Sequence, residues 1–353
     1  MRNTVSELAS RLQFGGGLLG SKRVQIALVL AFVVFSAGCM GGGGGGSDIN
    51  PADTVPAGVD GVMYFDGGIA TDQATTELMD GIIQMSDDVG PDDPQSWDEA
   101  IEQAESESDI DISDFQSATV FFKAPDGLEA ENVGDEYTGI IVQSNWEWEE
   151  LVEAADDEGM SDVEDQEYNG VTVHVGTTDG EETWVADFGD GTFVLGTEQP
   201  VKDAIDTQQG DADPFSGDIR EAYDNNEGSL MNAAIDVSDE EFNEGNAMVP
   251  EISVVTMNYD TDGSEMQFGM QMTTPSESDA EELANTLSFF LGSAGQEDPE
   301  LAQLAENLEV SNDGNQITFD YTTTTDQLLT LLEEANAGTT GSGFGSQQTA
   351  VSG

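Results

Sequence analysis

Basic residues are scarce in this chain. Among its 353 residues, 7 are Lys or Arg and 73 are Asp or Glu, which gives a formal net charge of -66 at pH 7. A protein that binds nucleic acid must supply Lys or Arg to replace the counterions around the phosphates, so the composition excludes nucleic acid as a partner. The same scarcity excludes binding to anionic lipid headgroups through a basic patch.

Cysteine and histidine are present once each, as Cys39 and His174. Zinc sites built from these residue types need several such ligands, so they are excluded by count. His174 lies within Val171-Thr-Val-His-Val175, where the three valines alternate onto one face of a predicted strand. His174 therefore lies on the opposite face, and we interpret it as a surface or helix-covered strand residue rather than a catalytic base.

A long hydrophobic run is missing from the N-terminal region. The apolar run there extends from Ile26 to Phe35, which is shorter than the roughly 20 residues that a transmembrane helix needs. The small residues Ser36-Ala-Gly-Cys39 follow this run. Four basic residues precede it: Arg2, Arg11, Lys22 and Arg23. This order is typical of a secretory signal peptide, which we place at residues 1–38.

Cys39 has no second cysteine to pair with. The motif Ser36-Ala-Gly-Cys39 resembles the lipobox of prokaryotic lipoproteins, although Ser36 stands where the family usually has leucine. The resemblance implies that Cys39 is lipidated, becomes the first mature residue and attaches the protein to the extracytoplasmic face of the cell membrane. Gly41–Gly46 follow, so we interpret residues 39–55 as a flexible tether. An uncleaved N-terminal anchor is the alternative.

Removal of the signal peptide makes the charge more one-sided. Lys123, Lys202 and Arg220 then remain as 3 basic residues against 72 acidic ones, because only Glu7 is lost from the 73, and the net charge becomes -69. Such a composition resembles that of proteins from extremely halophilic archaea. We expect folding to require salt, which shortens the screening length from roughly 10 Å at 0.1 M to about 3 Å at 1 M. A specific cation-binding surface is the alternative.

Hydrophobic patterning predicts strands alternating with helices between residues 56 and 337. One predicted hairpin turns at Asp262-Gly263, and Met266, Phe268, Met270 and Met272 share one face of its second strand. Both halves of the chain show one order of elements: strand, hairpin, helix, hairpin strands and C-terminal helix. We therefore predict an α+β fold of two tandem modules, a duplication, each a mainly antiparallel sheet with helices packed on one face.

The predicted modules span residues 56–208 and 229–337. Residues 209–228 form the linker or helical connection between them, and residues 338–353 form a disordered tail rich in Gly, Ser, Thr and Gln. Two unrelated α+β modules, or one continuous sheet, are the alternatives.

Sequence motifs for catalysis are not recognisable in the chain. It has no phosphate-binding or dinucleotide-binding glycine motif. Its carboxylates are too numerous to single out an acid–base pair. We therefore predict no enzymatic activity and keep a hydrolase as the alternative. The segment Asp260-Thr-Asp262-Gly-Ser-Glu265 resembles the start of a calcium loop, but it lacks the glycine at position six and the glutamate at position twelve. We prefer a hairpin turn there, keep Asp260, Asp262 and Glu265 as metal candidates, and predict no cofactor.

Two other groups of side chains allow a structural and a functional interpretation. Trp146 and Trp148 flank a predicted helix start. We place Trp148 on the core face of this helix and Trp146 at a more exposed position. Trp146 then either packs at the boundary of the core or belongs to a binding surface. Met257 together with the methionines of the second hairpin strand offers thioethers for Cu(I). We prefer core packing there, because methionine commonly fills gaps in cores.

The lipobox-like motif, the Gly-rich tether and the acidic α+β body together resemble haloarchaeal cell-surface lipoproteins of an uncharacterised family. Gly196–Asp206, a strand end that leads into a helix, resembles a recurrent element of that group. The resemblance implies a lipid-anchored surface protein that binds an envelope partner or has a structural role in the envelope. The alternative is a carrier of lipid or a small apolar ligand, or a solute-binding lipoprotein, in which the methionines and Phe289-Phe290 line a cavity between sheet and helices.

Overall fold

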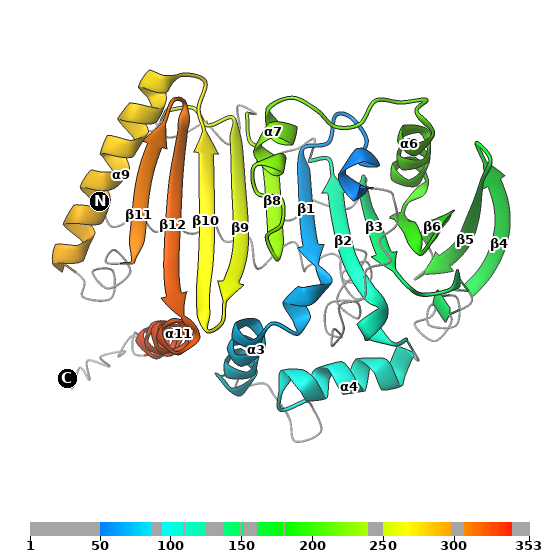
Figure 1. Cartoon of the computed structure of the whole chain (residues 1–353), viewed down its shortest axis with the longest axis horizontal. Helices are drawn as coiled ribbons and strands as arrows, with labels where there is room; N and C mark the ends of the chain where they lie inside the picture. The colour runs from blue at the N-terminus through cyan, green and yellow to red at the C-terminus, as the bar shows by residue number, and fades with distance from the viewer. Residues whose placement is uncertain are drawn as a thin grey trace, which may run out of the picture.

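The described strands pair into one antiparallel sheet. The computed structural model describes residues 50–85, 94–108, 110–124, 137–148, 150–151, 161–178, 181–238, 250–297 and 307–340. The strands in chain order are β1 (Gly61–Asp66), β2 (Phe115–Phe122), β3 (Thr138–Ser144), β4 (Ser161–Tyr168), β5 (Val171–Thr178), β6 (Glu181–Gly189), β7 (Thr192–Gly196), β8 (Met231–Asp236), β9 (Val254–Asp262), β10 (Glu265–Thr273), β11 (Leu308–Asp313) and β12 (Gln316–Thr324). This 12-stranded sheet has the order β11-β12-β10-β9-β8-β1-β2-β3-β7-β6-β5-β4 (Figure 1).

Six α-helices lie in the described part of the chain, accompanied by short 3-10 turns such as η1 (Pro51–Asp53). They are α3 (Gln73–Met85), α4 (Trp97–Ser108), α6 (Glu198–Gln209), α7 (Asp218–Asp224), α9 (Glu277–Glu297) and α11 (Thr325–Thr340). The predicted helix around Pro200 is confirmed as α6, and it ends at Gly210, whose φ of 77° is the left-handed conformation that favours glycine. Because α11 continues to Thr340, the first residues of the predicted tail are helical, whereas residues 341–353 lie outside the described part.

The sheet is continuous between the two predicted modules. β1 pairs with β8 from Gly61↔Ile235 to Phe65↔Met231, so the first strand of one module is hydrogen-bonded to the first strand of the other. The predicted α+β class and antiparallel pairing are confirmed, and the sheet has the continuous form that was the alternative. α7 lies within the predicted connection, residues 209–228. The duplication itself stays a prediction.

Helices cover both faces of the sheet in the N-terminal half, so the prediction of helices on one face is wrong there. On what we call the first face, Val62, Phe121 and Ile141 pack with Val201 and Ile205 of α6. On the opposite, second face, residues of α4 pack against alternate residues of the same strands: Trp97 and Ile101 against Ala118, Ile140 and Val142. The consecutive apolar residues 140–142 allow this arrangement, because such a run buries both sides of a strand.

The helix α3 ties the N-terminal half to the C-terminal half. Its Ala74 packs on the second face against Tyr259 of β9 and Met266 of β10. The hydroxyls of Thr75 and Tyr259 are 2.7 Å apart, and Thr261 donates a hydrogen bond of 2.6 Å to Asp72 just before α3. Figure 1 shows α3, α4 and α11 along the same end of the sheet. The core of the C-terminal half is therefore completed by a helix from the N-terminal half.

Candidate functional site

A row of apolar side chains crosses the second face of the sheet from β12 to β6. Each member is the direct cross-strand partner of the next. This apolar row consists of Phe319, Met270, Met257, Ala233, Met63, Val120, Ile140, Leu195 and Val185. It continues into the polar pair His174 and Asp165 on β5 and β4.

Coverage of the apolar row is uneven. Phe319 near α9 is 8% exposed and Ile140 near α4 is 5% exposed, so these flanks are buried. Between them, Met270, Met257 and Met63 are only half-buried. Three methionines in the middle of the row are thus only partly covered, whereas Ala233 between Met257 and Met63 is buried.

The predicted alternation of the methionines is confirmed. Met257 and Met270 are directly opposite each other, whereas Met272 is opposite Val255 and Met266 is fully buried in the core beneath α3. Met272 belongs to the core beneath α9. These contacts assign Met266 and Met272 to packing. The side chains of the other predicted cavity residues, Phe289 and Phe290, lie outside the described part.

His174 lies at the end of the apolar row beneath an indole ring. It is 5% exposed and faces away from Val173, as predicted. The imidazole lies on Trp148 with 3.5 Å between ring centroids and 16° between ring planes. Its Nδ1 is 2.8 Å from Oδ1 of Asp165, whose side chain is 78% exposed. The arrangement therefore stacks a titratable ring between the start of a helix and the edge of the sheet.

The predicted exposures of Trp146 and Trp148 are reversed. Trp146 is 3% exposed, its Nε1 donates a hydrogen bond of 2.7 Å to the Asp111 carbonyl, and its ring stacks on Phe115. Trp148 is half-buried. The reason is that Trp146 packs into the core beneath α4, whereas Trp148 lies over His174 of β5 and near Phe193 of β7. Residues 152–160, which complete the predicted helix, lie outside the described part.

The two lysines of the described part are both packed on aromatic rings. Lys123 Nζ lies 3.8 Å from the centroid of the Tyr137 ring. Lys202 Nζ lies 4.8 Å from the centroid of Trp184 and 5.1 Å from that of Tyr168. Ammonium groups in this position are attracted by the negative face of the ring.

Arg220 of α7 also packs on an aromatic ring. Its guanidinium lies 5.0 Å from the centroid of Phe215, its Nε donates to Asp224 at 2.7 Å, and its Nη1 donates to Asp53 at 3.1 Å. These bonds hold the start of the described chain on α7. Each basic side chain of the described residues therefore makes contacts within the fold.

Two tyrosines beside α6 each donate a hydrogen bond to an aspartate of that helix. The Tyr137 hydroxyl donates to Asp203 at 2.6 Å, and the Tyr168 hydroxyl donates to Asp206 at 3.0 Å. Burial, followed by the neighbouring carboxylate, raises the pKa of both phenols above the ordinary value for tyrosine.

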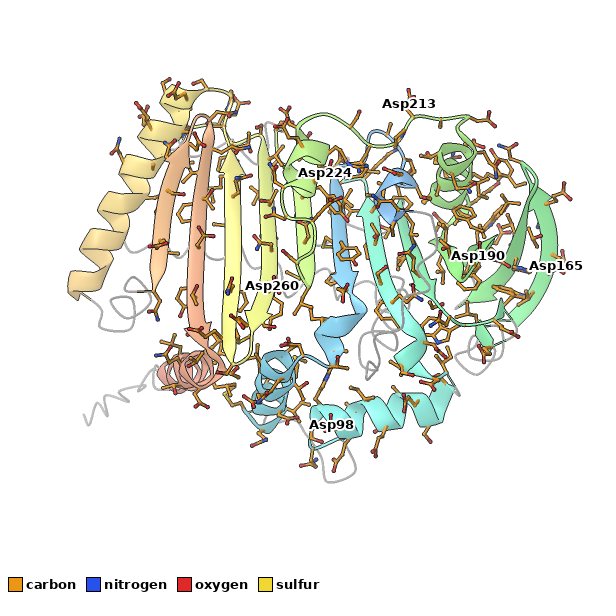
Figure 2. The ribbon with its side chains drawn as sticks, viewed as in Figure 1. Asp98, Asp165, Asp190, Asp213, Asp224 and Asp260 are labelled. Atoms are coloured by element: carbon orange, nitrogen blue, oxygen red, sulfur yellow. The ribbon has the colours of Figure 1, made fainter. Side chains whose placement is uncertain are left out.

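The metal candidates Asp260, Asp262 and Glu265 lie in the β9–β10 hairpin. Asp262 is directly opposite Glu265, and Gly263 in the turn has a φ of 69°, as the predicted Asp-Gly turn requires. Within the described residues, no three or more His, Cys, Asp or Glu side chains form a group that could hold a metal ion. The aspartates labelled in Figure 2 are spread over the molecule, from Asp98 on α4 to Asp165 on β4.

Cys39 and the tether up to residue 49 lie outside the described part of the chain. None of the helices that the structure describes is long and apolar enough to span a membrane.

No protein-family model matches this chain, and no curated protein sequence matches it. Its fold is similar to crystal structures of TP0453. Form III has a TM-score of 0.46 and 12% identity, and the match covers 81% of this chain and 99% of TP0453. Form I has a TM-score of 0.45 and 11% identity, and the match covers 82% of this chain and 98% of TP0453. Form IV has a TM-score of 0.46 and 13% identity, and the match covers 81% of this chain and 97% of TP0453. This similarity assigns no function to any residue.

Proposed function

We propose that the protein is a lipid-anchored, non-enzymatic binding protein on the extracytoplasmic face of the membrane of a salt-requiring organism. The observation that carries the proposal is the position of Cys39, the single cysteine, between a short apolar segment and a run of glycines. A thiol there has no disulfide partner within the chain, and the tether lets the sheet stand away from the bilayer. The protein then acts by binding an envelope partner or as part of the envelope structure.

The anchor is tested with Cys39→Ser in the full chain, expressed in a haloarchaeal host. We expect the natural chain to partition with membranes and to begin at residue 39 with a lipid mass attached. Cys39→Ser is expected to lose the lipid mass and the membrane partitioning. Ser36→Leu is the matched control, because it restores the usual lipobox residue and leaves the cysteine in place. Membrane-bound Cys39→Ser protein with an intact N-terminus would instead establish the uncleaved anchor.

The salt requirement rests on the charge distribution. The aspartates labelled in Figure 2 lie on different elements of the described part, while Lys123, Lys202 and Arg220 are used in internal contacts. Self-repulsion of this size opposes the compact state unless salt screens it. We expect cooperative unfolding to be lost below about 0.5 M KCl, where the screening length grows. Circular-dichroism melts over a KCl series test this, with sucrose as an uncharged control, and an unchanged melt in dilute buffer contradicts it.

A second candidate function is the carriage of an apolar ligand, and the apolar row favours it. Its half-buried centre holds Met63, Met257 and Met270, and an acyl or isoprenoid chain laid over them would remove their exposed area from water at about 25 cal/mol per Å². Organic extraction of protein purified from a haloarchaeal host, followed by mass spectrometry, tests this function. We expect copurifying lipid that Met257→Gln depletes. Thr318→Gln on the first face is the control, and protein free of lipid removes the candidate.

A further inference from the structure

We propose that three methionines of the apolar row, Met63, Met257 and Met270, form an oxidation site at which peroxide converts the row from an apolar to a polar surface. Oxidation of methionine to the sulfoxide replaces a flexible apolar side chain with a polar one and disrupts methionine-rich binding surfaces. The site itself rests on the geometry of the sheet. Its effect on a ligand rests on the second candidate function, the carriage of an apolar molecule.

The strand β10 carries methionines that are covered to different degrees. Met266, Met270 and Met272 all lie on the second face of this strand. Met266 is 0% exposed beneath α3, and Met272 is 8% exposed in the core beneath α9. Met270 lies between them and is half-buried, packing in part against the core beneath α9. The position of the two helices therefore determines which of these sulfur atoms a peroxide can reach.

The other two methionines of the proposed site belong to neighbouring strands. Met257 of β9 is the direct cross-strand partner of Met270 and is also half-buried. Met63 of β1 lies in the same row beyond the small side chain of Ala233, and it packs in part against Phe122. Directly opposite side chains have Cβ atoms about 4.5–5.5 Å apart, so sulfoxides at 257 and 270 are neighbours. Oxidation therefore changes a stretch of the row rather than one isolated point.

The reaction at each sulfur consumes one molecule of hydrogen peroxide. The thioether sulfur attacks one peroxide oxygen, so that a sulfur–oxygen bond forms and the oxygen–oxygen bond breaks. The sulfur is oxidised by two electrons, and the peroxide is reduced. The transferred oxygen gives up its proton to the leaving hydroxide, which departs as water. Each modified methionine thus gains one oxygen atom and becomes a hydrogen-bond acceptor in the apolar row.

Treatment of the full chain with hydrogen peroxide in about 1 M KCl, followed by peptide mass spectrometry, tests the site. Met63, Met257 and Met270 should each gain an oxygen atom at least about tenfold faster than Met266 and Met272, which react only when the core opens locally. Cleavage at acidic residues leaves the three methionines of β10 in one peptide, because no Asp or Glu lies between residues 265 and 277. Fragment ions then resolve the three sulfur atoms. Equal oxidation rates at Met270 and Met266 would overturn the proposal.

Nile red, a neutral dye that brightens in apolar surroundings, tests the effect on the row. We expect the natural chain to bind the dye, and to bind it at least about tenfold more weakly after oxidation, because a sulfoxide oxygen beneath the dye has no hydrogen-bond donor. The variant Met63→Leu/Met257→Leu/Met270→Leu keeps an apolar row that peroxide cannot oxidise, so it should bind the dye equally before and after treatment. The matched control replaces half-buried methionines outside the row and should stay sensitive to peroxide: Met79→Leu/Met85→Leu/Met231→Leu.

Reversal of the oxidation distinguishes sulfoxides from general damage. Methionine sulfoxide reductases A and B each reduce one epimer, so both together, with dithiothreitol as the electron donor, should restore dye binding. The chain has one cysteine, so dithiothreitol finds no intramolecular disulfide to break. An oxidised natural chain that binds Nile red as tightly as the untreated chain would overturn the proposed change of the row. An untreated chain that does not bind the dye would instead contradict the apolar-ligand function, and the oxidation rates would still decide the modification site. Far-UV circular dichroism of each sample distinguishes these outcomes from loss of folding.

Discussion

The contact between α3 and α11 at Gly81 makes a prediction that tests how the two halves are joined. A Cβ atom built on Gly81 would lie 2.3 Å from Cδ2 and 2.6 Å from Cδ1 of Leu329. Such distances are far inside van der Waals contact, so the two helices approach each other only because residue 81 has no side chain. Gly81→Ala therefore changes two opposing contributions to stability at once.

The two contributions can be separated with Leu329→Ala. In a helix interior, alanine is more favourable than glycine by about 1 kcal/mol. Overpacking a close contact costs typically about 1–3 kcal/mol. We expect Gly81→Ala to destabilise the natural chain by about 0–2 kcal/mol. In the Leu329→Ala background the clash is removed, so the same substitution should stabilise by about 1 kcal/mol.

Urea unfolding at constant KCl, followed by circular dichroism, measures all four members of this cycle. The predicted coupling energy between Gly81 and Leu329 is about 1–3 kcal/mol, well above the scatter of independent sites. Stabilisation by Gly81→Ala of equal size in both backgrounds would refute the reasoning, because it would mean that α3 and α11 do not approach each other at this point.

Two further predictions concern the first face. Phe121 is fully buried with its ring over Gly139, so Phe121→Ala should cost about 3–5 kcal/mol in urea unfolding, and an unchanged midpoint would contradict its place in the core. The pKa values of Tyr137 and Tyr168 are raised, first by burial and then by Asp203 and Asp206, so the folded state favours the neutral phenols. In the unfolded chain these phenols ionise near pH 10, so stability should be full below about pH 10 and fall as the pH rises above it. Thermal melts with phenolate absorbance measure this fall, which Tyr137→Phe should make less steep.

Local signals in the sequence predicted some elements closely. The hairpin predicted to turn at Asp262-Gly263 is observed as β9 (Val254–Asp262) and β10 (Glu265–Thr273). Its turn residues and its alternation are both encoded within one short stretch of chain. The strand β4 was missed, because its sequence lacks hydrophobic alternation and its side chains from Val163 to Glu167 are exposed. Asn169-Gly170, both with positive φ, was the turn signal that could have revealed it.

Contacts between distant segments could not be predicted from local sequence patterns. Ala74, Leu78 and Ile82 are four residues apart, a spacing that predicts one buried face of a helix, yet Ile82 in α3 is 41% exposed. Besides α4, which follows it in the chain, α3 packs on α11 and on the strands β9 and β10. These later elements follow it by almost two hundred residues or more, and no periodicity within α3 specifies them. The candidate site also depends on contacts between distant segments. The strands that contribute to the apolar row have recognisable apolar faces, but the strand order that aligns the row with His174 depends on long-range pairing such as β3 with β7.

The acidic side chains help to protect the exposed edges of the open sheet from pairing with other chains. β4 and β11 each have a strand neighbour on one side only in the described part, and such edges invite pairing with other chains. Acidic side chains on β4, such as Glu164 and Glu167, oppose that pairing. At about 1 M salt, however, repulsion reaches only about 3 Å, so it cannot keep two molecules apart at a distance. What then protects the edge is the cost of removing water from these carboxylates, together with the irregular register of β4 and β5 between Ser161 and Glu164. Neutral substitutions on β4 should therefore promote association even in concentrated salt, where a purely coulombic protection would already have vanished.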